Sequence, residues 1–127
     1  MSNYKKLNDI GNSASTTSAT VNSNISVVPE ITSLEDKNAL LKNNKLVVVD
    51  VYATWCGPCS DTTPLFAALY DKYKSLCILV RENVDLRLSP TVQVVPTFQI
   101  FVNGKLNSQI TGNSIEEVEN TILKFIK

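Results

Sequence analysis

The sequence run WCGPC at residues 55–59 places Cys56 and Cys59 three positions apart, directly after the apolar run at residues 46–53. Two thiols at this spacing can close a small disulfide and open it again. A cysteine exposed at the start of a helix is held partly as thiolate. The chemistry that these residues indicate is thiol–disulfide exchange.

The overall composition removes most other uses of a cysteine pair. Histidine is absent, which excludes haem attachment through Cys-x-x-Cys-His, histidine-dependent catalytic pairs and most mixed zinc sites. Three cysteines supply neither a disulfide framework nor four zinc thiolates, so half of a metal site is the alternative for the pair. We expect no metal and no cofactor beyond a redox-active Cys56–Cys59 disulfide.

Charge and hydropathy limit the partners and the location. Twelve basic and twelve acidic side chains cancel, so neither nucleic acid nor an anionic membrane is an expected partner. No apolar stretch of the signal-sequence kind lies near the N-terminus, and no apolar run is long enough to span a membrane. We expect a cytoplasmic protein. Abundant Asn, Lys and Ile suggest an AT-rich genome, for example of a protist or a large DNA virus, and in a virus packaging in the virion is the alternative.

Residues 1–24 are dominated by Ser, Thr and Asn and show no sustained helical or strand period. This composition predicts a disordered tail that acts as a spacer, and a targeting segment is disfavoured because the tail contains no arginine. The folded domain is expected to cover residues 25–127.

The domain is predicted to begin with a strand from Ile25 to Ile31. Thr32 and Glu35 then have the spacing of a capping box, which predicts the start of a helix. Residues 45–53 are rich in valine and nearly continuous in apolar character, as is typical of a strand covered on both faces. This strand should lie at the centre of a sheet.

A long helix should start near Cys56 and be kinked at Pro64, which removes one backbone hydrogen bond. Residues 77–80 form the next buried strand. Residues 96–102 alternate as a strand until Asn103-Gly104, a strong signal for a hairpin.

The hairpin partner is predicted at residues 105–111, and Ser114 and Glu117 have capping-box spacing before a closing helix. The order is βαβαβ followed by ββα. Alternating strands and helices require parallel strands, whereas the hairpin requires an antiparallel pair. The fold class is therefore α/β with a mixed five-stranded sheet.

The two active cysteines are expected to play unequal roles. Cys56 at the helix start lies near unpaired backbone N–H groups and the positive end of the helix dipole, which favour its thiolate as the attacking nucleophile. Cys59, one turn further along, should be more shielded and should attack the mixed disulfide that Cys56 forms. Cys77, within an apolar strand, should be an inert small hydrophobe, with a redox sensor as the alternative.

Asp50 is a carboxylate inside an otherwise apolar strand. Loss of hydration should raise its pKa and suit it to pass a proton to or from Cys59. The alternative places Asp50 on a solvated strand edge without a role.

These features together resemble the thioredoxin family over residues 27–127. The residues that carry the resemblance are WCGPC after a strand containing Asp50, then Pro64, Val95-Pro96-Thr97, Asn103-Gly104 and Gly112. The resemblance implies a thioredoxin-like three-layer sandwich. It also implies a monomeric protein-disulfide reductase that forms a mixed disulfide with protein substrates and takes electrons from a thioredoxin reductase or another donor.

The resemblance also implies a docking surface for the substrate. Trp55 would form a wall of the groove, with core filler as the alternative, and the Val95-Pro96 bond would be cis so that Val95 pairs with an extended substrate. Gly-Pro between the cysteines is typical of reductants in this family. The implied substrate-binding residues are Trp55, Gly57, Pro58, Val95, Pro96 and Gly112.

The chain departs from the family pattern in two places. The segment from Asp85 to Pro96 is short, so the third helix should be shortened or missing and the rim that a reductase would contact is changed. Ser60 and Asp61 stand where many relatives have a basic residue. Arg81 is the nearest candidate for a cation beside Asp50.

Three functions follow from these features. The first is reduction of protein disulfides. The second is a thioredoxin-fold binding subunit or packaged structural component with incidental redox activity. The third, oxidase or isomerase activity, is disfavoured by Gly57-Pro58 and the absent secretory signal.

Overall fold

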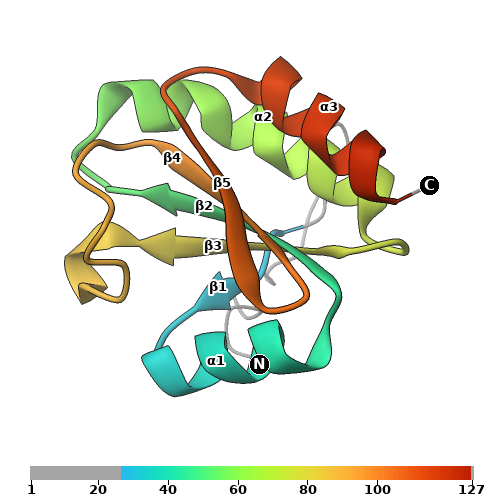
Figure 1. The fold of residues 1–127 in the computed structure, drawn as a ribbon. Coiled ribbons are helices and arrows are strands. Elements are labelled where there is room, and N and C mark those ends of the chain that lie inside the picture. Colours follow the sequence, from blue (N-terminus) through green and yellow to red (C-terminus); the bar gives the residue numbers. More distant parts are fainter. Residues whose placement is uncertain (1–26, 127) are drawn as a thin grey trace, which may run out of the picture.

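The computed structural model describes residues 27–126, in which five strands form one mixed sheet of order β1-β3-β2-β4-β5 (Figure 1). The predicted tail, residues 1–24, lies outside this part of the chain. The strands are β1 (Glu30–Ile31), β2 (Leu46–Tyr52), β3 (Ile78–Asn83), β4 (Thr97–Val102) and β5 (Lys105–Thr111). The helices are α1 (Leu34–Asn43), α2 (Gly57–Tyr73), the short 3₁₀ helix η4 (Val84–Leu86) and α3 (Ile115–Phe125).

The sheet is covered on both faces, with α2 and α3 on one side and α1 on the other (Figure 1). β1, β3 and β2 are parallel, whereas β4 runs antiparallel to β2 and β5 to β4. β2 lies between β3 and β4, and its residues 46–51 are buried. The predicted order, the mixed sheet and the central valine-rich strand are thus confirmed.

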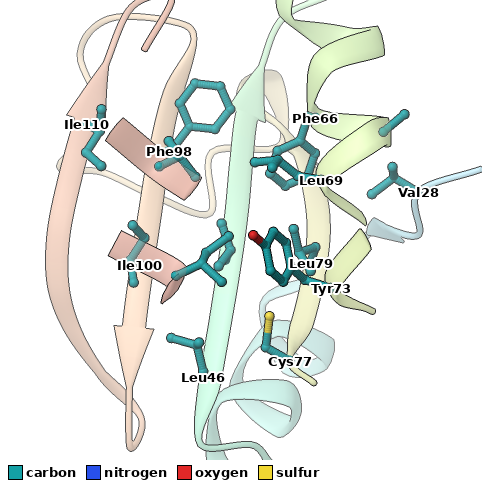
Figure 2. Packing of buried hydrophobic residues seen from close by; sticks show 14 residues of the cluster. Val28, Leu46, Phe66, Leu69, Tyr73, Cys77, Leu79, Phe98, Ile100 and Ile110 are labelled. Atoms are coloured by element: carbon teal, nitrogen blue, oxygen red, sulfur yellow. The ribbon is translucent and has the colours of Figure 1, made fainter. Parts of the chain in front are cut away.

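Two apolar clusters lie on opposite faces of the sheet. The larger one packs Phe66 and Leu69 of α2 and Val118 of α3 against Leu79 and Phe98 (Figure 2). The smaller one packs the valines on the other face of β2 against Leu40 and Leu41 of α1. Because β2 contributes side chains to both clusters, burial of its two faces holds the strand that carries Asp50.

The prediction of a strand over residues 25–31 is wrong in length. Only Glu30 and Ile31 pair with β3, and Ile25 lies outside the described residues. Pro29 has no N–H to donate to the ladder, although its carbonyl accepts a bond of 2.9 Å from the Arg81 amide. Regular pairing therefore begins after the proline.

The predicted capping box of Thr32 and Glu35 is displaced by one residue. Ser33 caps α1, and its hydroxyl accepts a hydrogen bond of 3.1 Å from the Asp36 amide. Serine and threonine are both good N-caps, so the spacing alone does not choose between adjacent candidates.

The other two helices begin where predicted. α2 follows Cys56 and continues through Pro64, where the expected kink stays a prediction. α3 follows Ser114, but the capping box with Glu117 is wrong, because the Ser114 hydroxyl donates to the Thr111 carbonyl at 3.3 Å. In residues 27–126, no helix is long and apolar enough to span a bilayer.

The segment between β3 and β4 contains only η4 and an irregular loop, residues 87–96. The third helix that the family resemblance implied is therefore reduced to one short 3₁₀ turn. Arg87 ends this turn with a left-handed backbone, at φ 59°. The loop ends at the Val95–Pro96 peptide, which is cis, and leads directly into β4.

Candidate active site

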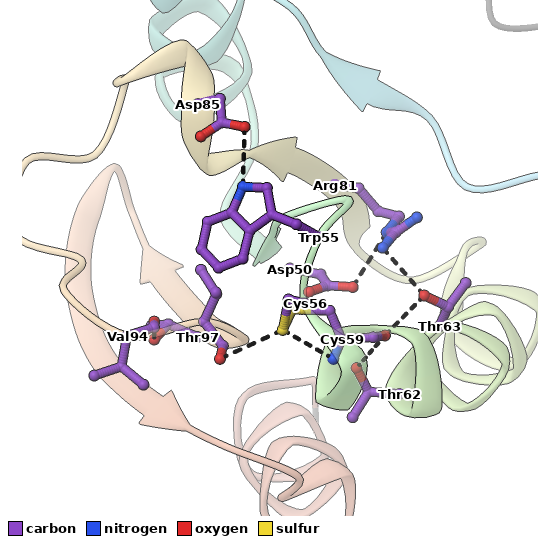
Figure 3. The surroundings of a disulfide bond; sticks show 11 residues. Asp50, Trp55, Cys56, Cys59, Thr62, Thr63, Arg81, Asp85, Val94 and Thr97 are labelled. Carbon is purple, nitrogen blue, oxygen red and sulfur yellow. Dashed lines mark hydrogen bonds and ion pairs between the residues drawn. A yellow bond between two sulfur atoms is a disulfide. The ribbon is translucent and has the colours of Figure 1, made fainter.

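The cysteine pair lies where the chain passes from the central strand β2 into α2 (Figure 3). Cys56 is the N-cap of α2 and forms a disulfide with Cys59, so the structure holds the oxidised form. The Cys56 Sγ accepts a hydrogen bond of 3.1 Å from the Cys59 amide. In the reduced form, this amide and the helix dipole would stabilise a Cys56 thiolate.

Cys56 is less accessible than the sequence indicated. Its exposed fraction is 7%, against 2% for Cys59, so the predicted order holds while both residues are buried. The cover comes from the loop before β4, whose Val95 carbonyl oxygen lies 3.6 Å from the Cys56 Sγ. The Cys56 sulfur therefore faces the backbone carbonyl of Val95.

The other predicted docking residues lie on the segments that flank Cys56 and Val95. Trp55 is 68% exposed, so the core alternative is wrong, and its indole Nε1 donates to Asp85 Oδ2 at 3.3 Å (Figure 3). The Gly112 amide donates to the Pro96 carbonyl at 2.8 Å. This bond fixes Pro96 against the end of β5, while Gly57 and Pro58 occupy the first turn of α2.

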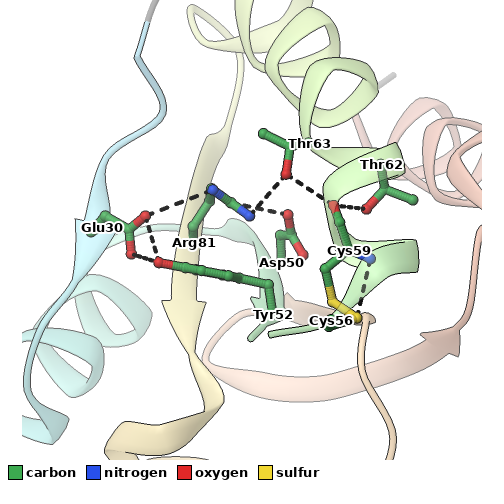
Figure 4. Close-up of polar contacts among 8 residues, drawn as sticks. All are labelled: Glu30, Asp50, Tyr52, Cys56, Cys59, Thr62, Thr63 and Arg81. Atoms are coloured by element: carbon green, nitrogen blue, oxygen red, sulfur yellow. Dashed lines mark hydrogen bonds and ion pairs between the residues drawn. A yellow bond between two sulfur atoms is a disulfide. The ribbon is translucent and has the colours of Figure 1, made fainter. Parts of the chain in front are cut away.

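Asp50 is fully buried on β2, which excludes the solvated-edge alternative. Its Oδ2 accepts a hydrogen bond of 3.2 Å from Arg81 Nε, as the predicted pairing requires, whereas Oδ1 has no hydrogen-bond partner in the described part of the chain. Burial raises the pKa of Asp50 to about 6, and the Arg81 charge opposes that rise. Asp50 lies between the Arg81 guanidinium and the cysteine pair (Figure 4).

Arg81 is held by a set of side chains that the sequence did not reveal. Its guanidinium stacks on the Tyr52 ring, 3.7 Å from the centroid, and lies 3.9 Å from Glu30. The Tyr52 hydroxyl donates to the same Glu30 carboxylate at 2.9 Å (Figure 4). In the parallel sheet, Arg81 of β3 is paired with Glu30 on one neighbouring strand and with Asp50 on the other. This strand register is the signal from which the contact with Glu30 could have been predicted.

A further link joins Arg81 to the cysteine helix. Arg81 Nη2 donates to the Thr63 hydroxyl at 3.2 Å, and that hydroxyl donates to the Cys59 carbonyl at 2.9 Å. The guanidinium thus contacts both the buried carboxylate and the turn that carries Cys59. Thr63 gave no signal in the sequence because threonine is common on exposed helix surfaces.

The remaining cysteine lies apart from this site. Cys77 is buried immediately before β3 and not within the strand as predicted, and burial raises its thiol pKa to about 11. At neutral pH, it is therefore a protonated small hydrophobe. In residues 27–126, no group of three or more His, Cys, Asp or Glu side chains is arranged to hold a metal ion.

The helix α2 begins at the cysteine pair, the central strand carries a buried carboxylate, and a proline precedes the strand next to the sulfur. This arrangement is that of a dithiol–disulfide oxidoreductase. Residues 27–127 match the family described as Thioredoxin, and the chain belongs to the thioredoxin family. The protein has protein-disulfide reductase activity of the thioredoxin type, with the Cys56–Cys59 pair at the active-site position.

Relatives support this placement along the whole domain. Thioredoxin of Gallus gallus is 37% identical over 105 residues, which is 79% of this chain and 100% of the relative. Thioredoxin of Rattus norvegicus is 40% identical over 85 residues, 65% of this chain and 81% of the relative. Reduced Schistosoma mansoni thioredoxin pre-protein superposes with a TM-score of 0.71 at 40% identity, covering 80% of this chain and 100% of the other.

Proposed function

We propose that this chain transfers two electrons from the Cys56–Cys59 dithiol to disulfides of protein substrates, with no cofactor. The observation that carries the proposal is the position of the Cys56 Sγ. It accepts from the Cys59 amide at 3.1 Å and lies 3.6 Å from the Val95 carbonyl, next to the backbone segment to which we assign substrate docking.

The reaction begins with the Cys56 thiolate. It attacks one sulfur of the substrate disulfide, which forms a mixed disulfide and releases the other substrate sulfur as a thiolate. Cys59 then loses its proton to the Asp50 carboxylate and attacks the Cys56 Sγ. The second substrate thiolate leaves, the Cys56–Cys59 disulfide closes, and the substrate has gained the two electrons.

Substrate recognition uses the backbone before β4. An extended substrate segment would pair with Val95 as a short added strand, beside Trp55 and Pro96. A thioredoxin reductase or another dithiol donor would restore the dithiol, meeting a rim altered by the short loop 87–96. We propose that the chain acts as a monomer in the cytoplasm, where disulfides are kept reduced.

The first test is DTT-driven reduction of insulin disulfides. The Cys56→Ser variant should fall to the rate of DTT alone, because the attacking thiolate is lost. Cys77→Ser is the matched control and should keep the wild-type rate. Catalysis by Cys56→Ser would overturn the assignment, and a biological effect that survives this substitution would favour the binding or packaged component.

A second test separates the roles of the two cysteines. Cys59→Ser should accumulate a covalent adduct with the substrate protein, because the resolving thiol is missing. DTT should release the adduct, and mass spectrometry should place the bond on Cys56. An adduct on Cys77, or none in Cys59→Ser, would contradict the proposed order of attack.

A further inference from the structure

A charged cluster is buried on the face of the sheet away from the cysteines. Lys37 of α1 is 4% exposed, Glu82 of β3 is fully buried, and their Nζ and Oε1 atoms are 2.8 Å apart. Successive strand residues point to opposite faces, so Glu82 and the adjacent Arg81 point away from each other. Neither Lys37 nor Glu82 takes part in the proton and thiol chemistry described above.

Each polar atom of the cluster has a partner. The three N–H bonds of Lys37 meet three acceptors, which are Glu82 Oε1, Ser89 Oγ at 2.7 Å and Gln99 Oε1 at 2.9 Å. The Ser89 hydroxyl donates to Glu82 Oε2 at 2.6 Å. Gln99 continues the network through its Nε2, which donates to Gln109 Oε1 at 3.3 Å.

Stability alone does not account for such a cluster. Replacing a buried ion pair by apolar side chains of similar size is often neutral or stabilising, because desolvation offsets the Coulomb attraction. Hydrogen bonds add direction, which apolar contacts lack. The cluster therefore fixes the position of the chain segment that it contacts more precisely than an apolar core would.

The segment that the Lys37–Glu82 cluster contacts is the loop 87–96. Ser89 connects this loop to α1 and to β3, and Thr91 adds a hydrogen bond of 3.1 Å to Gln109 on β5. The loop has no helix of its own, and it ends at Val95, whose carbonyl faces the Cys56 sulfur at 3.6 Å. Besides the bonds from Thr97 to the Val94 carbonyl and from Gly112 to the Pro96 carbonyl, contacts on the opposite face of the sheet thus hold this loop.

We propose that Lys37, Glu82 and Ser89 form a positioning cluster that holds Val95 in place for docking of protein disulfides. The inference rests on the proposed function, because it assigns to this loop the binding of the substrate backbone. The cluster governs the affinity for extended protein substrates and leaves the thiol chemistry of Cys56 unchanged.

The test uses Ser89→Ala, which removes the link to the loop and keeps the Lys37–Glu82 ion pair. The KM for insulin should rise roughly three- to tenfold, since a misplaced positioning group weakens productive binding. The kcat for insulin and the rate with 2-hydroxyethyl disulfide, which has no backbone to pair, should stay at wild-type values. Ser89→Thr restores the hydroxyl and should restore the KM.

Ser108→Ala is the matched control, because the Ser108 hydroxyl contacts only its neighbour Asn107 among the hydrogen bonds described for it. An unchanged insulin KM in Ser89→Ala, or an equal loss with insulin and the small disulfide, would overturn the proposal. Amide hydrogen exchange provides a readout independent of activity. In Ser89→Ala, the amides of residues 92–95 should exchange faster while those of β4 stay protected. This exchange result does not depend on insulin reduction, so a wild type that fails to reduce insulin would refute only the proposed function.

Discussion

Two buried carboxylates in this protein have opposite surroundings. Asp50 has one oxygen bonded to Arg81 and one oxygen without a partner, whereas both oxygens of Glu82 are bonded, to Lys37 and Ser89. A buried carboxylate that lacks a hydrogen-bond partner on one oxygen has its pKa raised toward neutrality, which suits proton transfer. A fully satisfied one is suited to holding structure. This difference matches the roles that we propose, proton transfer for Asp50 and positioning for Glu82.

The pKa of Asp50 predicts the pH dependence of disulfide reduction. In the oxidised form, this pKa is raised to about 6, so below pH 6 Asp50 carries the proton that the leaving Cys59 thiolate needs. The rate of reduction of the protein by DTT, divided by the DTT thiolate concentration, should therefore fall as pH rises through about 6. Asp50→Asn should lack this step and be slower at pH 5 by about 10²-fold, the low end of general acid contributions.

The measurement is stopped-flow fluorescence of Trp55, the single tryptophan, which lies beside the disulfide. Asp61→Asn is the matched control, because Asp61 is an exposed carboxylate in the first turns of α2. It should keep the wild-type profile. The same pH profile in Asp50→Asn and wild type would show that another group supplies the proton.

At the level of elements, the sequence predicted what is encoded within a segment and missed what is set between segments. The valines of β2 and the Asn103-Gly104 turn are local signals, and both elements are found where expected. The extent of β1 depends on its partner β3, so the strand was predicted too long. Lys37 gave no signal, because a lone lysine on a helix is usually solvated and its buried partners come from distant elements.

The hairpin between β4 and β5 should depend on its glycine. Asn103 and Gly104 both have positive φ, 53° and 84°, and a Cβ at Gly104 would lie 3.4 Å from the Leu41 carbonyl. Gly104→Ala should lower the free energy of unfolding by about 1–2 kcal/mol, because an L-residue is strained in this region. Urea denaturation measures the change. Gly57→Ala, whose Cβ meets nothing within 4 Å, is the control and should not destabilise.

At the level of the whole molecule, the sheet separates chemistry from docking control. The face under α2 carries Asp50 and Arg81 beside the disulfide, and the face under α1 carries the Lys37 cluster. The two faces are joined at the contact between Cys56 and Val95, because β2 leads into Cys56 and the loop after β3 leads into Val95. The family resemblance predicted the site residues on the first face through WCGPC, Asp50 and Pro96. It implied nothing about the second, which depends on which charged side chains the fold brings together.

The burial of Asp50 should reduce the stability of the whole domain at neutral pH. Its pKa is raised from 3.8 to about 6, so well below pH 3.8 it is protonated in both the folded and the unfolded protein and has no effect. Between pH 3.8 and 6 the unfolded chain ionises first and stability falls, and above pH 6 the penalty levels off at about 3 kcal/mol. Asp50→Asn should therefore stabilise the oxidised protein in urea by up to that amount at pH 7.5, and by much less at pH 4. Glu119→Gln is the control of opposite sign, because Lys72 and Tyr73 lower the pKa of Glu119 and its stabilisation is lost as pH falls. A destabilised Asp50→Asn at pH 7.5 would contradict the prediction.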